Sequence, residues 1–516
     1  MNDYRIHFRT LLATVLIAAS SAELSFGNVK LPAIFSDHMV LQQGIKVPIW
    51  GWAEPGEQVE VTLGDQSAST AAGGDGVWRL ALENLKPGDA LTLVVKGKNT
   101  LTINDVMIGE LWLCSGQSNM EMPVMRARNA EQEIAAARFP QIRVFKVERQ
   151  PSLTPQADCR GTWEVCSPET AGKFSATAYF FGRELHRELR TPVGLVVAAW
   201  SGSAIEAWTS LPAQQVRPEF KELLASWDKQ DAEYNTSVAD AETSEFRKNL
   251  VQWKADAKKA KADNTTLPRA PRKPIDPRRH HHHPAVLFNG MIAPVMPYAI
   301  RGVIWYQGES NAKTAQSSAL YAVQLPLLIN DWRSRWGQGD FPFGWVQLPL
   351  ISAKTLHWAR LRDSQSKATT LPNTGMAVTY DIGQQHALHP KNKQDFGHRL
   401  AHWARARVYG QKVAWAGPHY SKHTARESAI EIGFDHVDGG LSIQGEGPLK
   451  GFLIAGSDRR WHAAEAAIKG DRVLVSSGEV SEPVAVRYCW TNAPVGNLTN
   501  TDGLPASPFR TDDWDE

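Results

Sequence analysis

Residues 109–123 have the sequence GELWLCSGQSNMEMP, and this stretch decides the fold. Its apolar part, residues 111–114, has the length and composition of a short buried strand. The strand ends at a small polar turn that contains Gly116, Ser118 and Asn119. A serine at such a junction can present both its hydroxyl and its backbone N–H to a substrate. Because glycine, serine and asparagine are also ordinary turn residues, this stretch alone favours a plain turn.

The chain around this stretch alternates between strands and helices. Apolar runs predict strands at 193–199, 303–306, 343–348 and 377–380, and helical periodicity predicts helices at 175–189, 321–336 and 391–408. Strands separated by helices form parallel sheets, which bind ligands beyond the carboxyl ends of the strands. The sequence therefore predicts an α/β domain over residues 106–410.

The two flanking regions lack helical periodicity. Short apolar segments separated by glycine- and proline-containing turns occupy residues 29–105 and 411–516. Such spacing is typical of β-sandwiches, so we expect a β-sandwich-like module at each end of the α/β domain.

The N-terminus has the pattern of a secretory signal. Arg5 and Arg9 precede an apolar run at residues 11–19, and Ser20-Ser21-Ala22 fits a cleavage site, with residues 25–27 as the alternative. The run is too short to span a bilayer. We therefore predict a signal peptide over residues 1–22 and a soluble protein in the periplasm or secreted.

Composition excludes several classes of protein. A formal net charge of +2 over 516 residues gives no reason to expect nucleic acid or a membrane as partner. No Cys/His spacing resembles a zinc site and no glycine-rich nucleotide loop occurs, so we expect no cofactor and no metal. Cys159 and Cys166 lie close enough in sequence for a small disulfide loop, with free thiols as the equal alternative.

An insertion rich in Lys, Glu, Asp and Ala occupies residues 212–284 of the α/β region. It predicts a charged surface helix near residues 246–261, followed by a mobile loop that ends in His280–His283. This histidine tract could bind a metal adventitiously. An exposed loop is favoured, because no acidic or cysteine partner stands at fixed spacing.

Three other strand ends carry residues suited to ester hydrolysis. Gly202 follows the strand at 193–199, and its N–H could face an oxyanion. Gln307 follows the strand at 303–306 and offers an amide donor, and Glu309 could orient neighbouring groups. His389 precedes the last helix, and its usual pKa near 6.5 suits a general base. Each also has an ordinary structural alternative, as a turn glycine, a polar cap or a structural histidine.

Four motifs in order carry a family resemblance: GQSNM at 116–120, WSG at 200–202, WYQGESN at 305–311 and LHPKNKQ at 388–394. Together they resemble the sialate O-acetylesterase family of SGNH-type hydrolases. The sequences LPAIFSDHMVLQ at 31–42, Asn497-Leu498 and GLPASPFR at 503–510 resemble the family's two ends. The resemblance covers nearly all of the mature chain.

The resemblance implies a serine esterase that removes O-acetyl groups from sialic acid or other acetylated glycans through an acetyl-enzyme. Ser118 would be the nucleophile and His389 the base. The oxyanion would be held by the N–H groups of Ser118 and Gly202 and by the Gln307 side chain, with Asn119 in support. An Asn usually fills the third role in related hydrolases, so Gln307 is assigned by motif position.

The acid of the triad departs from the family pattern. SGNH enzymes commonly place it three residues before the histidine, and some sialate O-acetylesterases two before, where this chain has His386 and Ala387. We favour Asp381, at a strand end farther upstream. Asp395 or Glu309 acting through space is an alternative, and so is a Ser118–His389 dyad oriented by a backbone carbonyl.

The competing hypothesis is a catalytically silent carbohydrate-binding protein. Two β modules and 19 Trp residues permit it, and the missing acid encourages it. The intact set of Ser118, Gly202, Gln307 and His389 argues against it. An α/β-hydrolase lipase is excluded, because Met120 stands where the nucleophile elbow of that fold requires glycine.

Overall fold

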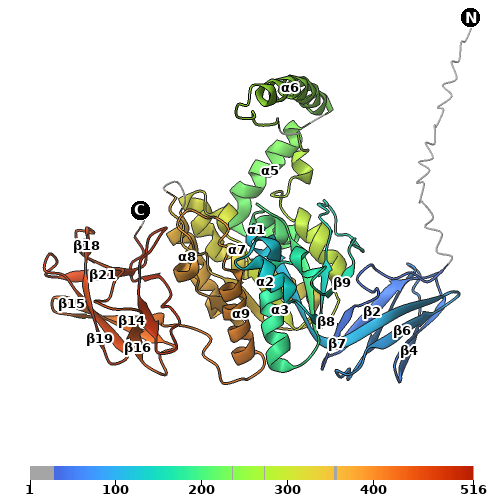
Figure 1. Cartoon of the computed structure of the whole chain (residues 1–516), viewed down its shortest axis with the longest axis horizontal. Helices are drawn as coiled ribbons and strands as arrows, with labels where there is room; N and C mark the ends of the chain where they lie inside the picture. The colour runs from blue at the N-terminus through green and yellow to red at the C-terminus, as the bar shows by residue number, and fades with distance from the viewer. Residues whose placement is uncertain (1–27, 235, 272–273, 354–356, 515–516) are drawn as a thin grey trace, which may run out of the picture.

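A computed structural model describes residues 28–234, 236–271, 274–353 and 357–514. The signal peptide predicted for residues 1–22 lies outside them. No helix among the described residues is long and apolar enough to cross a membrane. Figure 1 shows a β module, a central α/β block and a second β module side by side, with helices α5 (Lys221–Glu233) and α6 (Thr236–Ala262) projecting from the centre.

The central sheet has the strand order β13-β12-β11-β7-β10-β8-β9. All neighbours are parallel except the edge strand β9, which is antiparallel to β8. The strands are β7 (Thr100–Gly116), β8 (Phe139–Lys146), β9 (Trp163–Cys166), β10 (Val193–Ala199), β11 (Gly302–Tyr306), β12 (Phe343–Val346) and β13 (Thr374–Ala377). Strands β10, β11 and β12 are buried throughout, as parallel strands covered on both faces are. The predicted parallel α/β sheet is confirmed.

Helices cover this sheet in two packed pairs. Helix α3 (Ala176–Leu189) packs against α9 (Lys393–Arg407), and α7 (Ala315–Trp336) packs against α8 (Trp358–Lys367). Helix α3 begins where predicted, because the Ser175 side chain accepts a hydrogen bond from Ala178 N–H. Helix α7 begins six residues earlier than predicted, at a capping box formed by Thr314 and Ser317.

Three strands bring their carboxyl ends to one level. Strand β7 lies between β10 and β11, and Gly116 pairs with both Ala199 and Tyr306. The chain order reverses at this point, since β10 and β11 lie on opposite sides of β7. Open α/β sheets bind ligands at such a switch point.

The N-terminal module shares a strand with the central sheet. Strand β6 (Leu91–Lys96) pairs with the first part of β7, whereas β10 and β11 pair with its second part. The other strands of this module are β1 (Val40–Gln42), β2 (Val47–Trp52), β3 (Gln58–Leu63), β4 (Gln66–Ala71) and β5 (Val77–Leu82). The domain boundary predicted between residues 105 and 106 therefore falls inside a continuous strand.

The C-terminal module consists of two four-stranded sheets, β14-β15-β20-β19 and β18-β17-β21-β23, and the pair β16-β22. Its strands are β14 (His419–Arg426), β15 (Ala429–Asp435), β16 (Leu441–Ile443), β17 (Phe452–Gly456), β18 (Trp461–Ala463), β19 (Glu465–Lys469), β20 (Arg472–Ser476), β21 (Pro483–Tyr488), β22 (Leu498–Asn500) and β23 (Phe509–Arg510). All pairings are antiparallel.

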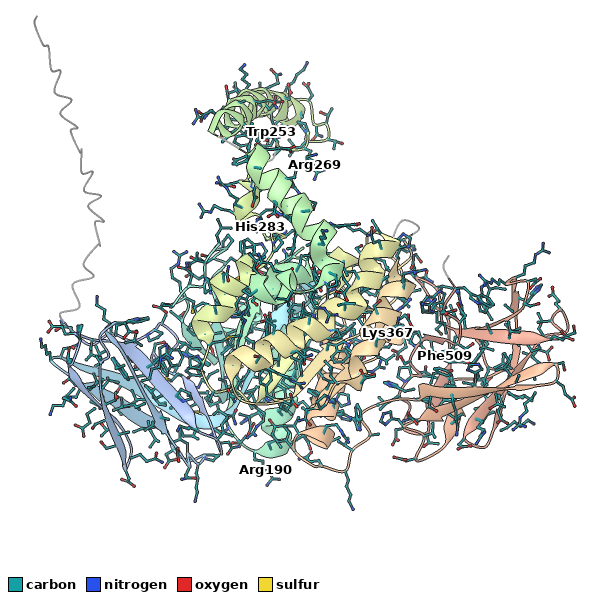
Figure 2. The ribbon with its side chains drawn as sticks, turned by 180° about the vertical axis from the view of Figure 1, so that it is seen from behind. Arg190, Trp253, Arg269, His283, Lys367 and Phe509 are labelled. Atoms are coloured by element: carbon teal, nitrogen blue, oxygen red, sulfur yellow. The ribbon has the colours of Figure 1, made fainter. Side chains whose placement is uncertain are left out.

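The insertion differs from its prediction. Helix α6 starts ten residues earlier than expected, and α4 (Leu211–Gln215) and α5 precede it. The histidine tract is not an exposed loop: His283 is 9% exposed and its Nε2 lies 2.9 Å from Asp231 Oδ2 on α5. In Figure 2 His283 lies at the base of the projecting helices. Cys159 and Cys166 are buried free thiols, without the disulfide considered above.

Candidate active site

The Ser118 turn depends on the glycine that ends β7. Gly116 has φ +138°, and a Cβ there would stand 2.2 Å from Tyr306 O. Only glycine allows β7 to pack against β11 and turn at this point. Ser118 begins the short helix α1 (Ser118–Glu121) and is partly exposed, with Gln117 Nε2 3.5 Å from its Oγ. Gln117 is thus the side-chain amide that the structure places beside Ser118 Oγ, a position not expected from the sequence.

Ser118 and His389 line one cavity of about 750 Å³. His389 reaches it from the loop between β13 and α9. Burial lowers the pKa of His389 below 6.5, and the nearby charges of Lys393 and Arg126 lower it further. The imidazole is therefore neutral at pH 7, as a general base must be.

The N–H groups of Ser118 and Gly202 are both available as donors. Gly202 follows β10 with φ +77°. Within the described residues neither N–H donates a hydrogen bond to the protein. Their strands end level with each other, because Gly116 pairs with Ala199. Backbone N–H groups without a protein acceptor at the ends of neighbouring strands are suited to an oxyanion hole.

Gln307 does not have the role predicted for it. Its Nε2 donates to Ser203 O at 3.1 Å and to Asn311 Oδ1 at 2.8 Å, and its Oε1 accepts from Tyr321 Oη at 2.9 Å. Both amide hydrogens are used inside the protein, and the residue is fully buried. Gln307 therefore ties the β11 loop to the Gly202 loop and has no hydrogen left for an oxyanion.

Asp381, which we predicted as the acid of the triad, makes its side-chain contacts with a residue other than His389. Strand β13 ends at Ala377, three residues before the predicted end, so Asp381 lies in a 3₁₀ turn (Tyr380–Ile382). Both of its carboxylate oxygens accept hydrogen bonds of 2.6 Å from Arg399 on α9. The Asp381 carboxylate is therefore ion-paired with Arg399 and makes no hydrogen bond to His389 among the described residues.

The two other candidate acids are likewise engaged elsewhere. Asp395 accepts from Asn392 Nδ2 at 2.5 Å, and Glu309 accepts from Asn119 Nδ2 at 2.5 Å. In the part of the chain that the structure describes, no carboxylate hydrogen-bonds His389. The remaining predicted arrangement is the Ser118–His389 dyad oriented by a backbone carbonyl, and among the described residues no backbone carbonyl hydrogen-bonds the His389 ring either.

Asn119 joins the serine turn to the histidine loop. Its Nδ2 donates to Glu309 Oε1 and, at 3.0 Å, to Leu388 O, the carbonyl just before His389. Its Oδ1 accepts a 2.5 Å hydrogen bond from Lys393 Nζ. Asn119 therefore holds the Ser118 turn and the His389 loop together.

Lys393 is the site residue that the sequence did not reveal. Its side chain is fully buried, with Nζ 4.9 Å from the ring centres of Tyr306 and Phe396. Burial lowers the pKa of Lys393 to about 7, although Glu309 opposes this shift, and burial raises the pKa of Glu309. Its one signal in the sequence is its position four residues after His389, at the start of the predicted helix.

The cavity beside Ser118 is strongly basic. Arg126, Lys146, Lys173 and Lys391 line it, and no ion pair of these four occurs among the described residues. The one acidic residue in its lining, Glu121, is paired with Arg149. A second cavity of about 610 Å³ shares Glu121, Lys146, Arg149 and Lys173 with the first, but Glu148 and Glu164 also line it, so the excess of positive charge is confined to the cavity beside Ser118.

The described residues contain one group with potential metal ligands, which lies outside this cavity. Glu184 on α3 and His398 and His402 on α9 bring their ligand atoms within 4.8 Å of one another. The Glu184 carboxylate already accepts a 2.9 Å hydrogen bond from Arg405 Nη1. This group is therefore part of the ionic contact between α3 and α9.

Comparison with known proteins agrees with this geometry. A family profile described as "carbohydrate esterase, sialic acid-specific acetylesterase" matches residues 285–406. Sialate O-acetylesterases of Rattus norvegicus and Homo sapiens are each 29% identical to this chain, over 97% of it and 97% and 95% of their own lengths. The crystal structure of a carbohydrate acetylesterase from Xanthomonas citri, 36% identical, covers 94% of this chain and 100% of its own at a TM-score of 0.80. The chain thus belongs to the sialate O-acetylesterase family of carbohydrate esterases and is a carboxylic ester hydrolase.

Proposed function

We propose that this esterase removes O-acetyl groups from an acidic sugar, such as sialic acid, through an acetyl-enzyme on Ser118. The observation that carries the proposal is that Ser118 and His389 line one basic cavity at the switch point of the sheet. The free N–H groups of Ser118 and Gly202 stand at the same strand ends.

In the first half-reaction Ser118 Oγ attacks the acetyl carbonyl carbon while His389 accepts the hydroxyl proton. The carbonyl oxygen becomes an oxyanion that accepts from the N–H groups of Ser118 and Gly202. As the bond between the acetyl carbon and the sugar oxygen breaks, His389 returns the proton to that oxygen. The deacetylated sugar leaves and acetyl-Ser118 remains.

In the second half-reaction water replaces the sugar hydroxyl. His389 accepts a proton from the water as its oxygen attacks acetyl-Ser118, and the same N–H groups hold the new oxyanion. His389 then protonates Ser118 Oγ, and acetate leaves. In this mechanism Asn119, through Leu388 O, supplies the orientation of the His389 loop that a carboxylate supplies in a triad.

The charge of the cavity supports an acidic substrate. Four cations without ion pairs surround Ser118 and His389. A carboxylate on the sugar would gain charge-assisted hydrogen bonds from these Lys and Arg side chains. A neutral acetylated glycan such as xylan would leave these cations unpaired.

The nucleophile is tested by acetate release from O-acetylated sialic acids and from p-nitrophenyl acetate. Ser118→Ala should lower kcat by at least about 10³-fold. Ser421→Ala, at an exposed serine on β14, is the matched control and should keep wild-type kcat. Full activity of Ser118→Ala would exclude the acetyl-Ser118 mechanism.

The substrate class is tested separately. The double variant Lys146→Gln/Lys173→Gln should raise KM for O-acetylated sialic acid about tenfold, or roughly 1.4 kcal/mol. It should leave KM for neutral p-nitrophenyl acetate unchanged. Lys422→Gln, at an exposed β14 lysine, is the control. An equal response of both substrates would contradict the acidic-sugar assignment while leaving the esterase mechanism intact.

We also propose that the protein is exported to the periplasm or secreted. The support is the sequence pattern of Arg5, Arg9 and the apolar run that follows them. N-terminal sequencing of the mature protein should find a chain beginning after Ala22. An uncleaved chain confined to the cytosol would contradict this.

A further inference from the structure

The carbonyl of Gly202 receives two hydrogen bonds from outside its own loop. Ser310 Oγ donates to Gly202 O at 2.8 Å from the loop after β11. His282 Nε2 donates to the same oxygen from the histidine tract of the insertion. These contacts join the insertion directly to the loop that carries the second oxyanion donor.

The neighbouring residues of that loop are held as well. The Trp200 ring stacks on His281, with ring centres 5.7 Å apart and planes 12° apart, and the Arg149 guanidinium lies 5.4 Å from the Trp200 ring centre. Glu121 Oε2 accepts from Ser201 N at 2.9 Å and from Ser201 Oγ at 2.7 Å. The loop is therefore clamped between helix α1 and the histidine tract.

The tract is itself anchored to the projecting helices. His283 Nε2 lies 2.9 Å from Asp231 Oδ2, and the Trp227 ring centre lies 5.1 Å from that of His283, both partners being on α5. Helix α5 thus fixes the position from which His282 reaches Gly202.

A glycine needs such external support more than any other residue. Gly202 has φ +77° and no side chain, so its own conformational preferences hold its N–H direction only weakly. Donors on its carbonyl anchor the peptide plane that follows Gly202 and so restrict the φ and ψ rotations that set the direction of its N–H. A misplacement of about 1 Å in a catalytic group can cost about 10²-fold in rate.

His282 stays in one protonation state near neutral pH, so its hydrogen bond to Gly202 O does not depend on pH there. Burial lowers the pKa of His282 to about 4, against the opposing effect of its hydrogen bond to Gly202 O. At neutral pH the ring is therefore uncharged, and donation to a carbonyl requires the tautomer with hydrogen on Nε2.

We propose that His282 is a positioning residue of this esterase: by its hydrogen bond to Gly202 O, the insertion holds the Gly202 N–H in the oxyanion hole. The inference rests on the proposed acetyl-Ser118 mechanism. It gives the 212–284 insertion a part in turnover, although none of its described residues lines the Ser118 cavity.

The test compares three substitutions of His282 with p-nitrophenyl acetate as substrate. His282→Ala and His282→Phe both remove the donor, and the second keeps a ring in place. Both should lower kcat at least tenfold and change KM less than threefold, because an oxyanion hole acts on the transition state. His282→Gln keeps an amide donor at a similar reach and should recover kcat to within about threefold of wild type.

The matched control is His280→Asn in the same tract. His280 Nδ1 accepts from His282 N–H at 3.2 Å, and an asparagine Oδ1 can accept the same bond. This variant should keep kcat within about twofold, and thermal unfolding should show all four variants folded. If His282→Ala does not fold, the comparison of His282→Phe with His282→Gln decides.

The outcomes separate the two proposals. Wild-type activity that survives Ser118→Ala overturns the proposed mechanism. Activity that depends on Ser118 but persists in His282→Phe, or fails to recover in a folded His282→Gln, overturns the positioning role alone.

Discussion

Among the residues that the structure describes, His389 has no carboxylate partner of the kind that holds the imidazolium in a triad. In a triad, the acid raises the pKa of the histidine and stabilises its charged form. Here burial, Lys393 and Arg126 all lower the pKa of His389. The missing charge makes His389 a weaker base that is neutral over a wider pH range.

This gives a first prediction, on pH. Because only neutral His389 can accept the Ser118 proton, kcat/KM should rise with pH through an apparent pKa below 6.5 and be level above it. A carboxylate behind His389 would move that rise to 6.5 or higher. The pH–rate profile of the wild type with a neutral ester distinguishes the two.

The second prediction concerns Asp381. Asp381→Asn breaks an ion pair with Arg399 whose two side chains are 14% and 13% exposed. It should lower the free energy of unfolding by about 1–3 kcal/mol and leave kcat within about threefold of wild type. Urea unfolding and steady-state kinetics check this. If the variant instead lost about three orders of magnitude in turnover at unchanged stability, Asp381 would be restored as the acid.

Residues defined by a strand end could be predicted from sequence, and those defined by pairing across elements could not. Ser118, Gly202 and His389 each follow an apolar strand or precede a helix, which local patterns show. Asp381 occupies a similar place, yet its partner is Arg399, 18 residues away on one face of α9. Which face of α9 meets the turn depends on packing that no local pattern contains.

Three separate elements meet at Asn119. Helix α1 contributes Asn119, the β11 loop Glu309 and α9 Lys393, and the three side chains form one buried hydrogen-bonded chain. A buried group without its partner costs more than the hydrogen bond itself contributes. This chain therefore fixes the arrangement of α1, α9 and the histidine loop together.

The third prediction follows from Lys393. Its pKa is about 7 in the folded protein and near 10.4 in an unfolded chain, so the unfolded state binds more protons between these values. Stability due to Lys393 should therefore rise with pH from about 7 to about 10. Lys393→Met removes this group, so the difference in unfolding free energy between wild type and variant should change over that window by up to a few kcal/mol. A difference that is independent of pH would contradict the lowered pKa.

Element types were predictable because of their periodicity, whereas their ends depended on caps and neighbours. Thr314 caps α7 before the apolar face of the helix begins. Because the first turn is mostly polar, the apolar periodicity did not show that it is helical. Strand β13 ends early because it pairs with β12 over only four residues. No local pattern marks Lys393 as buried, and its burial comes from the contact of α9 with Tyr306 of β11.

At the scale of the whole molecule, the C-terminal module contributes to the catalytic block. Asn492 Oδ1 accepts hydrogen bonds from the N–H groups of Trp358 and Ala359 at 2.9 and 3.3 Å, and so caps α8 from outside. Arg362 of α8 donates to Thr491 O, and Tyr380 Oη lies 3.1 Å from Tyr488 Oη. The two parts are thereby joined through polar contacts as well as packing.

The fourth prediction tests this junction. Asn492→Ala removes the cap of α8 and should lower the unfolding free energy by about 1 kcal/mol. Asn492→Asp keeps an acceptor at the helix start and should lose less than half as much. Denaturant unfolding of the three proteins measures both values. Both variants also lose the 2.7 Å hydrogen bond from Asn492 Nδ2 to Ala353 O, so equal losses would assign the stability to that bond instead of to the cap.

Because β7 is a single continuous strand, it restricts how the N-terminal module can be exchanged by recombination. Modules joined by a linker are exchanged between proteins by recombination within that linker. Here the N-terminal module lies at the start of one strand, Thr100–Gly116, and the Ser118 turn follows its end. A crossover between them would join halves of two unrelated strands. We therefore expect the Ser118 turn and the N-terminal β module to occur together in related proteins and to be exchanged by recombination only as a pair.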